Sequence, residues 1–501
     1  MKTILVVIVG ILMFFPAFSQ KQLTLATQIW SNTYDKPAGS DLDRIVEFEG
    51  GFITIRRDED ILLFQKYDAV MNETAHKEVN FKHKPKKLYY KGIYKVENNF
   101  FIVTIYNNKE TGKYNFYTQK ISATDFSISN PEILFSITNS EGSLDEAVGI
   151  SQDSTLLYFM YQKPVVDSKN SILEIKVFKP NLELLWERTF DKGEFISYLK
   201  ETDKSVSIAY SNLSLNNNGD VGIICTVYKK DKTYEKDEPS YYKAIVTITG
   251  MGETVVPYLV NLNEKYVRDV FVKWHDDKLF LAGSYQEFTK NKPEDRKTEA
   301  HYGSFFCYIN TETEEFSEPV FQSNDWGYYY SFTDIIFTPK NYYTIGEVSY
   351  THIVSTGKST TTYYVYREIY VNAYDSDMEF AWTSKVDKNQ YARTYNFSSF
   401  TYSYANGNLY FLYNDNCKNI ELEKSGEDLK AFDKNGYGKN TCMYLAKVDN
   451  EGKVEKEIMY NIDDIDALLT MPTESKAFSD GNLVLFVRRK DKFRFVSVKF
   501  K

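Results

Sequence analysis

The sequence is poor in the residue types that most often carry chemistry. It has five His among 501 residues, and the five show no metal-ligand spacing; they are His76, His83, His275, His301 and His352. No Gly-x-Ser-x-Gly nucleophile motif occurs. The sequence therefore predicts no metal and no cofactor, and it favours a binding module over an enzyme.

The chain also lacks an excess of basic residues. It has 60 Lys and Arg against 69 Asp and Glu, which gives a net charge of −9. A nucleic-acid partner requires a basic surface, so none is expected. The basic run FKHKPKK at residues 81–87 is interpreted as a solvated loop.

After the first twenty residues, no apolar run is long enough to span a bilayer, which needs about 20 residues. The N-terminal run itself is shorter. It covers Ile4–Phe15, follows the basic Lys2, and precedes a small-residue cleavage site after Ser19. We therefore expect a signal peptide at 1–19 and one mature domain at 20–501. Because the cleavage site has no Cys, we expect an exported product that is neither lipid-anchored nor membrane-inserted.

Aromatic residues, in contrast, are abundant. They make up 16% of the chain, with 41 Tyr and 35 Phe, and this favours strands. One pattern recurs eight times: a turn rich in Gly, Asn or Asp, followed by a strand of large apolar residues. The eight strands begin at Phe52, Phe100, Leu156, Val221, Leu279, Tyr342, Leu409 and Leu483. Repeats on this scale are typical of solenoids, propellers and arrays.

Each copy is preceded by a short strand and followed by a hairpin, so each unit reads as four antiparallel strands, A to D. Repeated four-stranded units predict an all-β chain folded as a single β-propeller, because stacking covers both faces of every sheet. Eight blades are predicted, with seven as the alternative. The last unit lacks a D strand. We expect residues 22–30 (QLTLATQIW) to pair beside Phe493–Phe500 and to close the ring.

The predicted connections are unequal in length. The A–B turns are short, as are most C–D turns, whereas several B–C and D–A connections are long. The long B–C inserts are Gln286–Ala300, Val348–Thr361 and Asn414–Thr441, and the long D–A crossings are Asp191–Lys204, Asp387–Asn396 and Asn461–Lys476. B–C and D–A connections emerge on the same face of a propeller, and function usually resides on loops held by a rigid scaffold. This elaborated face is therefore the predicted binding face.

The four cysteines divide into two kinds. Cys417 and Cys442 lie at the stem of the longest insert, so a disulfide between them is predicted, as an exported protein can keep one. Cys225 and Cys307 fall within strands of different units and are predicted to be buried free thiols.

One group of polar residues is predicted to converge on the elaborated face between units six and seven. Its members are the candidate ligand-binding residues Glu347, Trp382, Lys388, Gln390, Asn414, Asp415, Lys418 and Asn419. Two carboxylates with amides and a Lys suit a polar ligand, a cation or a glycan. The alternative is a hydrogen-bonded network that fixes the long loops.

The same stretches resemble a known group. Gly346-Glu347, the Trp382–Gln390 segment and the Tyr413–Asn419 segment, together with Leu279–Thr313 and FKPNLELLWE, resemble uncharacterised secreted β-propeller-like proteins of Bacteroidota. The resemblance covers most of the mature chain. It implies export from a Gram-negative cell and supplies no catalytic residues. No type IX sorting domain follows the last strand, which favours the periplasm over the cell surface.

Three functions remain open at this point. The first is an exported module that binds or scaffolds an envelope protein or a glycan through the elaborated face. The second is a glycan-active hydrolase or lyase, with Glu347 and Asp415 as candidate acid and base, which would require two carboxylates roughly 5–10 Å apart in a pocket. The third is a purely structural cell-envelope protein that binds no small ligand.

Overall fold

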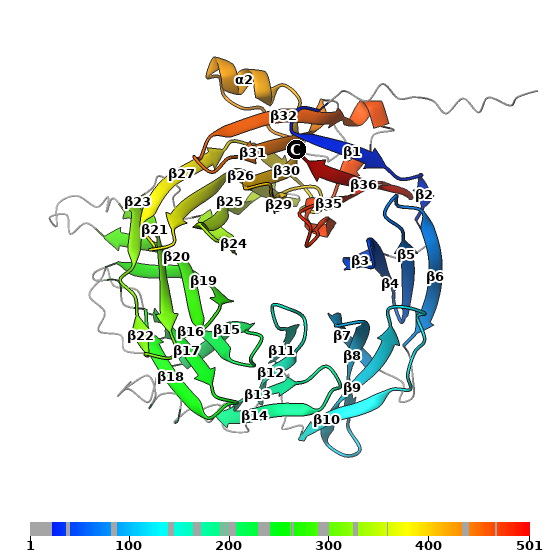
Figure 1. Ribbon diagram of the computed structural model, residues 1–501, viewed down its shortest axis with the longest axis vertical. Helices are drawn as coiled ribbons and strands as arrows, with labels where there is room; N and C mark the ends of the chain where they lie inside the picture. The colour runs from blue at the N-terminus through cyan, green and yellow to red at the C-terminus, as the bar shows by residue number, and fades with distance from the viewer. Residues whose placement is uncertain are drawn as a thin grey trace, which may run out of the picture.

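In the computed structural model, eight β-sheets stand around a central axis like the blades of a propeller (Figure 1). The structure describes residues 23–36, 41–81, 88–138, 145–163, 172–190, 194, 197, 207–228, 241–260, 262, 265–288, 300–323, 329–357, 359–432, 440–465 and 468–501. The predicted signal peptide and most of the basic run lie outside these residues.

In blades 1 to 4, four consecutive strands form each antiparallel sheet. Blade 1 consists of β3 (Asp41–Phe48), β4 (Gly51–Asp58), β5 (Ile61–Tyr67) and β6 (Glu73–Asn80); blade 2 of β7 (Leu88–Val96), β8 (Asn99–Asn108), β9 (Lys113–Ser122) and β10 (Glu132–Thr138); blade 3 of β11 (Asp145–Ile150), β12 (Leu157–Lys163), β13 (Ile172–Phe178) and β14 (Leu184–Phe190); blade 4 of β15 (Ser207–Leu215), β16 (Val221–Tyr228), β17 (Tyr241–Thr249) and β18 (Thr254–Leu259).

Blades 5 to 7 follow the same order, and blades 5 and 6 each have one extra short strand. Blade 5 consists of β19 (Tyr266–His275), β20 (Lys278–Phe288), β21 (Ala300–Asn310), β22 (Glu315–Phe316) and β23 (Val320–Ser323); blade 6 of β24 (Tyr330–Phe337), β25 (Asn341–Ser355), β26 (Thr360–Asp375), β27 (Phe380–Val386) and β28 (Gln390–Ala392); blade 7 of β29 (Thr401–Ala405), β30 (Asn408–Asn416), β31 (Thr441–Val448) and β32 (Val454–Asn461). The prediction of eight blades is confirmed.

Blade 8 is assembled from both ends of the described chain. Its strands are β33 (Leu469–Thr470), β34 (Lys476–Ala477), β35 (Leu483–Arg489), β36 (Lys492–Phe500), β1 (Ala26–Trp30) and β2 (Tyr34–Asp35). β1 runs antiparallel to β36, from Ala26 opposite Phe500 to Trp30 opposite Val496, and the two strands lie side by side in Figure 1. The predicted closure by the N-terminal strand is confirmed. The innermost position of blade 8 is divided between β33 and β34, which both pair with β35.

The hydrophobic core is distributed over the contacts between neighbouring blades. Successive side chains of a strand point to opposite faces of its sheet. Leu157 and Phe159 of β12 therefore pack towards blade 2, while Met160 packs towards blade 4. Every pair of adjacent blades shares such a cluster, including blades 8 and 1, where Phe486 and Phe52 belong to one cluster. This periodic packing explains why the repeated strands are mainly apolar.

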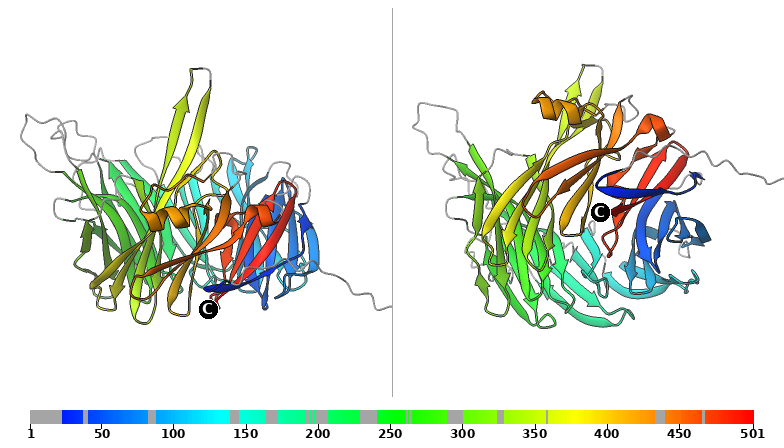
Figure 2. Two further views of the ribbon diagram at one scale, coloured as in Figure 1. Left: turned by 90° about the horizontal axis from the view of Figure 1, so that it is seen from above. Right: turned by 45° about the horizontal axis from the view of Figure 1, so that its top comes forward.

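The second strands of all eight blades coincide with the repeated motif, but three connections differ from expectation. Residues 348–361 do not form a loop, because β25 and β26 continue through them as a hairpin that rises from one face (Figure 2). The crossing at 387–396 contains β28, and the insert at 414–441 contains helix α2 (Asn419–Ser425). Short 3-10 helices, η2 (Ile462–Ile465) and η3 (Pro472–Glu474), lie in the last crossing.

The other long connections, 286–300 and 191–204, lie largely outside the described residues. Among the helices that the structure describes, none is long and apolar enough to cross a membrane.

Candidate functional site

The candidate site lies where the crossing from blade 6 to blade 7 passes over the elaborated face. β28 of this crossing pairs with β26, placing Gln390 opposite Tyr366. Six of the eight candidate residues meet here in a buried group that we call the blade 6–7 network: Glu347, Lys388, Gln390, Asn414, Asp415 and Asn419. Four segments of chain contribute to it, namely β25, the crossing with β28, the end of β30 and the start of α2.

An ion pair joins blade 6 to the crossing. The ammonium of Lys388 contacts Oε1 of Glu347, and both side chains are buried. Ser399 Oγ donates a hydrogen bond of 2.7 Å to Oε2 of Glu347. Both carboxylate oxygens of Glu347 therefore have protein partners, and neither faces solvent.

Gln390 uses both ends of its amide. Its Oε1 accepts hydrogen bonds from Lys388 Nζ at 3.0 Å and from the backbone N–H of Ser399 at 2.7 Å. Its Nε2 donates to the carbonyl oxygen of Asn414 at 2.7 Å. The Asn414 side chain in turn donates to the carbonyl oxygens of Phe397 (2.9 Å) and Thr470 (2.7 Å), and Thr470 belongs to β33 of blade 8. The network thus spans three blades.

Asp415 connects the end of β30 to the insert. Its Oδ1 accepts hydrogen bonds from Asn419 Nδ2 at 2.9 Å and from the backbone N–H of Asn416 at 2.8 Å. Asn419 also exchanges two hydrogen bonds with the backbone of Lys430, which fixes the return of the insert. These contacts hold α2 and the segment after it against blade 7.

Burial dominates the electrostatics of the network. It raises the pKa of Asp415 to about 7, against the opposing effect of the bonds from Asn419 and Asn416. Burial also raises the pKa of Glu347 and lowers the pKa of Lys388, while their mutual attraction opposes both shifts. A buried charge is costly unless it is paired, so the ion pair is what permits Glu347 to be ionised there.

Two candidate residues are not part of this network, and the expectation of convergence is wrong for Trp382. Trp382 donates its indole N–H to the carbonyl oxygen of Asn450 at 3.2 Å, beside the C–D turn of blade 7 on the opposite face. Its apolar ring packs against Gly452 there. Lys418 is exposed at the start of α2. Sequence spacing alone did not show which end of β27 carries Trp382.

The predicted disulfide is confirmed. Cys417 and Cys442 are bonded, 25 residues apart in the sequence. Cys225 and Cys307 are buried free thiols, also as predicted. In the described residues, no group of three His, Cys, Asp or Glu side chains is placed to hold a metal ion.

Directly beyond the network, the hairpin of β25 and β26 extends from the face. We call residues 349–366 the projecting hairpin. Its Tyr363 stacks on Tyr391 of β28, with ring centroids 4.6 Å apart, and Tyr391 hydrogen-bonds to His352 at 2.8 Å. At its base, Tyr350 contacts Tyr329, with centroids 4.7 Å apart.

Several side chains around this hairpin are accessible. Tyr329 is 49% exposed and Tyr395 56% exposed, and Ile353 near the tip is 62% exposed. Sequence reasoning missed this feature because residues 348–361 were interpreted as a loop. The alternation of Thr, Tyr and Val after residue 360 is a strand signal that could have revealed it.

No protein-family model and no curated protein matches the chain. Among solved structures, it is similar to the WD40 domain of SCAP from fission yeast (10% identity, 95% of this chain and 98% of the other, TM-score 0.40) and to the polysaccharide lyase Uly1 (12% identity, 86% and 100%, TM-score 0.39). A third is the β-propeller domain of the trilobed protease from Pyrococcus furiosus (9% identity, 86% and 98%, TM-score 0.35). At these values the likeness carries no argument about function.

Proposed function

We propose that this chain is an exported binding module that engages an envelope protein or a glycan through its elaborated face. The observation that carries the proposal is the projecting hairpin on a rigid propeller, with Ile353 exposed near its tip and Tyr329 and Tyr395 exposed beside it. Tyr rings supply large contact area at low conformational cost, whether the partner is a protein or the face of a sugar ring.

The blade 6–7 network supports this role by holding the base of the hairpin. Gln390 and Lys388 adjoin β28, and β28 pairs with residues 364–366 of β26. The ammonium of Lys388 also lies 5.7 Å from the ring centre of Tyr366. Glu347, Lys388 and Gln390 then contribute to binding by orienting the hairpin, while Asp415 and Asn419 fix the insert. This is the role of a hydrogen-bonded network that holds the long connections in place.

The enzymatic alternative finds less support in this geometry. Glu347 and Asp415 are 6% and 1% exposed, and each is hydrogen-bonded within the network. A general acid or base must come within hydrogen-bond reach of its substrate. Catalysis by these two carboxylates would therefore require the network to open.

Export into an oxidising compartment belongs to the same proposal. The Cys417–Cys442 disulfide suits the periplasm or the exterior, because cytosolic thiols are kept reduced. The N-terminal signal predicted from the sequence provides the route.

A trimmed variant tests the proposed function. Replacing residues 351–364 by Asn-Gly joins Tyr350 to Val365, which already face each other, through a two-residue turn. We expect the trimmed mature chain to melt like the wild type and to lose binding on a glycan array and in a pull-down from envelope extract. A matched control, Leu259→Ala, alters an exposed apolar side chain on the outer rim of blade 4. Equal binding by the trimmed chain would contradict the proposal.

A further inference from the structure

One edge of the projecting hairpin has no neighbouring strand. β24 pairs with β25 only as far as Val348, and β26 pairs with β27 and β28 on its own far side. Residues 349–355 of β25 therefore have a strand on one side only. Within the described part of the chain, no strand pairs with their other side.

The backbone groups that point to this open side can be identified. The backbone N–H of Thr356 donates to the carbonyl oxygen of Ser359 at 3.0 Å, which makes this a hydrogen-bonded pair at the hairpin turn. In an antiparallel ladder such pairs alternate with pairs whose N–H and C=O groups point away from the partner. The register runs without a shift from Ser355 back to Ser349. Ser355, Ile353 and Thr351 thus direct both backbone groups outward.

Apart from a register shift between Glu347 and Ser349 at its base, this edge lacks the features that normally keep open strand edges from pairing. Edge strands are usually short, bulged, charged or interrupted by Pro. The outer strands of five blades follow that rule: β6 carries Lys77 and Glu78, β14 carries Glu187 and Arg188, β18 carries Pro257, β27 carries Lys385, and β32 carries Glu455, Lys456 and Glu457. Residues 349–355 read SYTHIVS, with no Pro, Lys, Arg or acidic residue. Their β-branched and aromatic side chains favour a strand.

We infer that the open edge of β25 binds an extended segment of a partner protein, which adds to the hairpin as a further strand. The inference rests on the proposed function and names the partner class. Outward N–H and C=O groups on alternate residues match an extended main chain, which offers the same groups at the same spacing. A glycan lacks that repeat.

The size of the edge argues against a second copy of this chain as the occupant. Stable interfaces between proteins involve about 20–30 residues on each side, whereas this edge offers residues 349–355 on a hairpin that stands away from the ring (Figure 2). A short peptide can bind through main-chain hydrogen bonds, with specificity from alternate side chains. Alternate side chains of the bound peptide would lie beside Tyr350 and His352 on one face of the hairpin. The remaining ones would lie beside Thr351 and Ile353 on the other face. The segment is therefore expected to be weakly charged and rich in aromatic and β-branched residues.

The test uses random 12-residue peptides displayed on phage and selected against the full mature chain. A labelled consensus peptide is then titrated against the wild type, Thr351→Pro and Thr351→Val. Pro removes one outward N–H and blocks the edge, and it is tolerated where the N–H faces solvent; Val keeps the N–H. We expect the Pro variant to weaken binding by at least about tenfold and the Val variant to change it less than about twofold. Methylating alternate backbone nitrogens of the peptide should abolish binding.

Separate outcomes would overturn the inference. They are failure to enrich any peptide, equal binding to the Pro variant, or equal binding of the methylated peptide. Ile353→Lys serves as a second edge-blocking variant if Thr351→Pro melts at a lower temperature than the wild type. A concentration-dependent dimer in light scattering that Thr351→Pro abolishes would assign the edge to a second copy. Glycan binding that the trimmed hairpin loses and Thr351→Pro retains would overturn this inference and leave the proposed function intact.

Discussion

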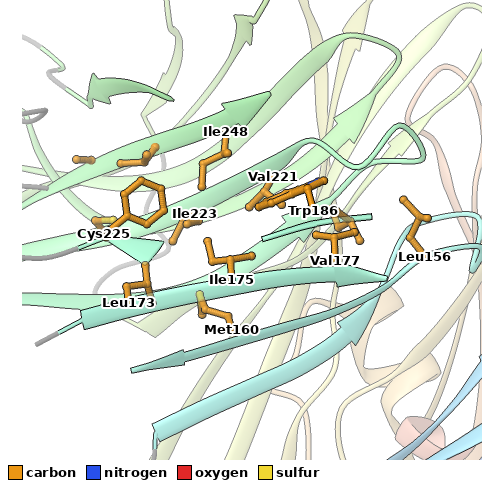
Figure 3. Close-up of a cluster of buried hydrophobic side chains, with 14 of the residues drawn as sticks. Leu156, Met160, Leu173, Ile175, Val177, Trp186, Val221, Ile223, Cys225 and Ile248 are labelled. Carbon is orange, nitrogen blue, oxygen red and sulfur yellow. The ribbon is translucent and has the colours of Figure 1, made fainter. Parts of the chain in front are cut away.

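Blades 3 and 4 meet mainly through a large apolar cluster, with hydrogen bonds from Tyr158, Trp186 and Arg188 to the backbone of blade 4 at its margins, whereas blades 6 and 7 meet partly through buried charge. Between blades 3 and 4, Ile175, Val177 and Ile223 pack together with further apolar residues (Figure 3). Between blades 6 and 7, an apolar cluster is also present, but the end nearest the elaborated face is occupied by Glu347 and Lys388.

The apolar contact and the polar contact serve two different tasks: the first stabilises the stacking of blades, and the second fixes the direction of the segments that leave them. Apolar burial is non-directional, so it stabilises the stacking of blades without fixing the direction of a segment that leaves them. Hydrogen bonds and ion pairs have fixed geometry, and the blade 6–7 network places them where the crossing, the insert and the projecting hairpin all begin. We expect disruption of the polar contact to cost more and to reach the binding face.

Lys388→Ala is expected to have the largest effect. It leaves the Glu347 carboxylate buried without its ion partner, so the free energy of unfolding should fall by about 3–5 kcal/mol. Urea denaturation measures this loss. A decrease below about 1 kcal/mol would show that the ion pair does not set the stability of this contact.

The double variant Glu347→Leu/Lys388→Met is the matched control for this change. Replacing both buried charges with apolar side chains of similar size is often neutral for stability. The double variant should therefore unfold within about 1 kcal/mol of the wild type. Amide exchange in residues 349–366 should nevertheless become faster, since the directional contacts at the base of the hairpin are gone. Unchanged exchange would contradict the division of tasks proposed above.

Asp415→Asn should change the pH dependence of stability. Burial raises the pKa of Asp415 from an ordinary value of 3.8 to about 7, so the folded state holds this proton more tightly than the unfolded chain. The resulting stability is complete below about pH 4 and is lost as the pH rises to about 7. Relative to Asp415→Asn, the wild type should lose up to about 4 kcal/mol over that range.

Urea denaturation of both chains from pH 4 to pH 8 gives this difference. Glu474, whose pKa burial also raises to about 7, is present in both chains, so its own titration largely cancels. Parallel stability profiles would show that Asp415 does not titrate in this range.

Removal of the disulfide should cause the next largest loss of stability. Cys417→Ser/Cys442→Ser opens a loop of 25 residues, and the chain-entropy model assigns about 3.5 kcal/mol to a loop of that length. The melting temperature of the double variant, compared with that of the wild type, measures the effect. The insert with α2 should become a site of limited proteolysis. An intact insert after proteolysis would mean that the Asn419–Lys430 contacts alone hold it.

The smallest effect is expected in the apolar contact. Ile223→Val removes one methylene group between blades 3 and 4 and should cost about 0.5–1.5 kcal/mol. Its cost should not vary with pH, and peptide or glycan binding should be unchanged. A variant that unfolds normally but loses binding would show that the apolar contact also orients the binding face.

The periodic part of the molecule could be predicted from the sequence, and the irregular part only in outline. The repeated strands at Phe52, Leu279 and Leu409 were recognisable because each is buried on both faces and therefore mainly apolar. Pairing of the N-terminal strand followed from the missing partner of Phe493–Phe500. These inferences rest on local patterns that repeat.

The candidate site was predictable in composition but not in detail. Glu347, Lys388 and Asp415 were singled out together, but the sequence did not show that Glu347 pairs with Lys388, that Asp415 accepts from Asn419, or that all three are buried. Burial of Lys388 depends on β28 lying across β26, a pairing of distant segments without its own sequence signal. Trp382 was misplaced because it lies at the other end of a strand whose bounds were uncertain.

The pairing of β1 with β36 also bears on the order in which the chain becomes structured. Thr27 lies opposite Lys499, and contacts between residues so far apart in sequence form slowly, because a long loop must close first. During synthesis, blades 1 to 7 can each complete their own hairpins as they emerge. Blade 8 cannot be completed until β36 has been synthesised, and β1 remains unpaired until then. The ring is therefore completed as the final step of folding.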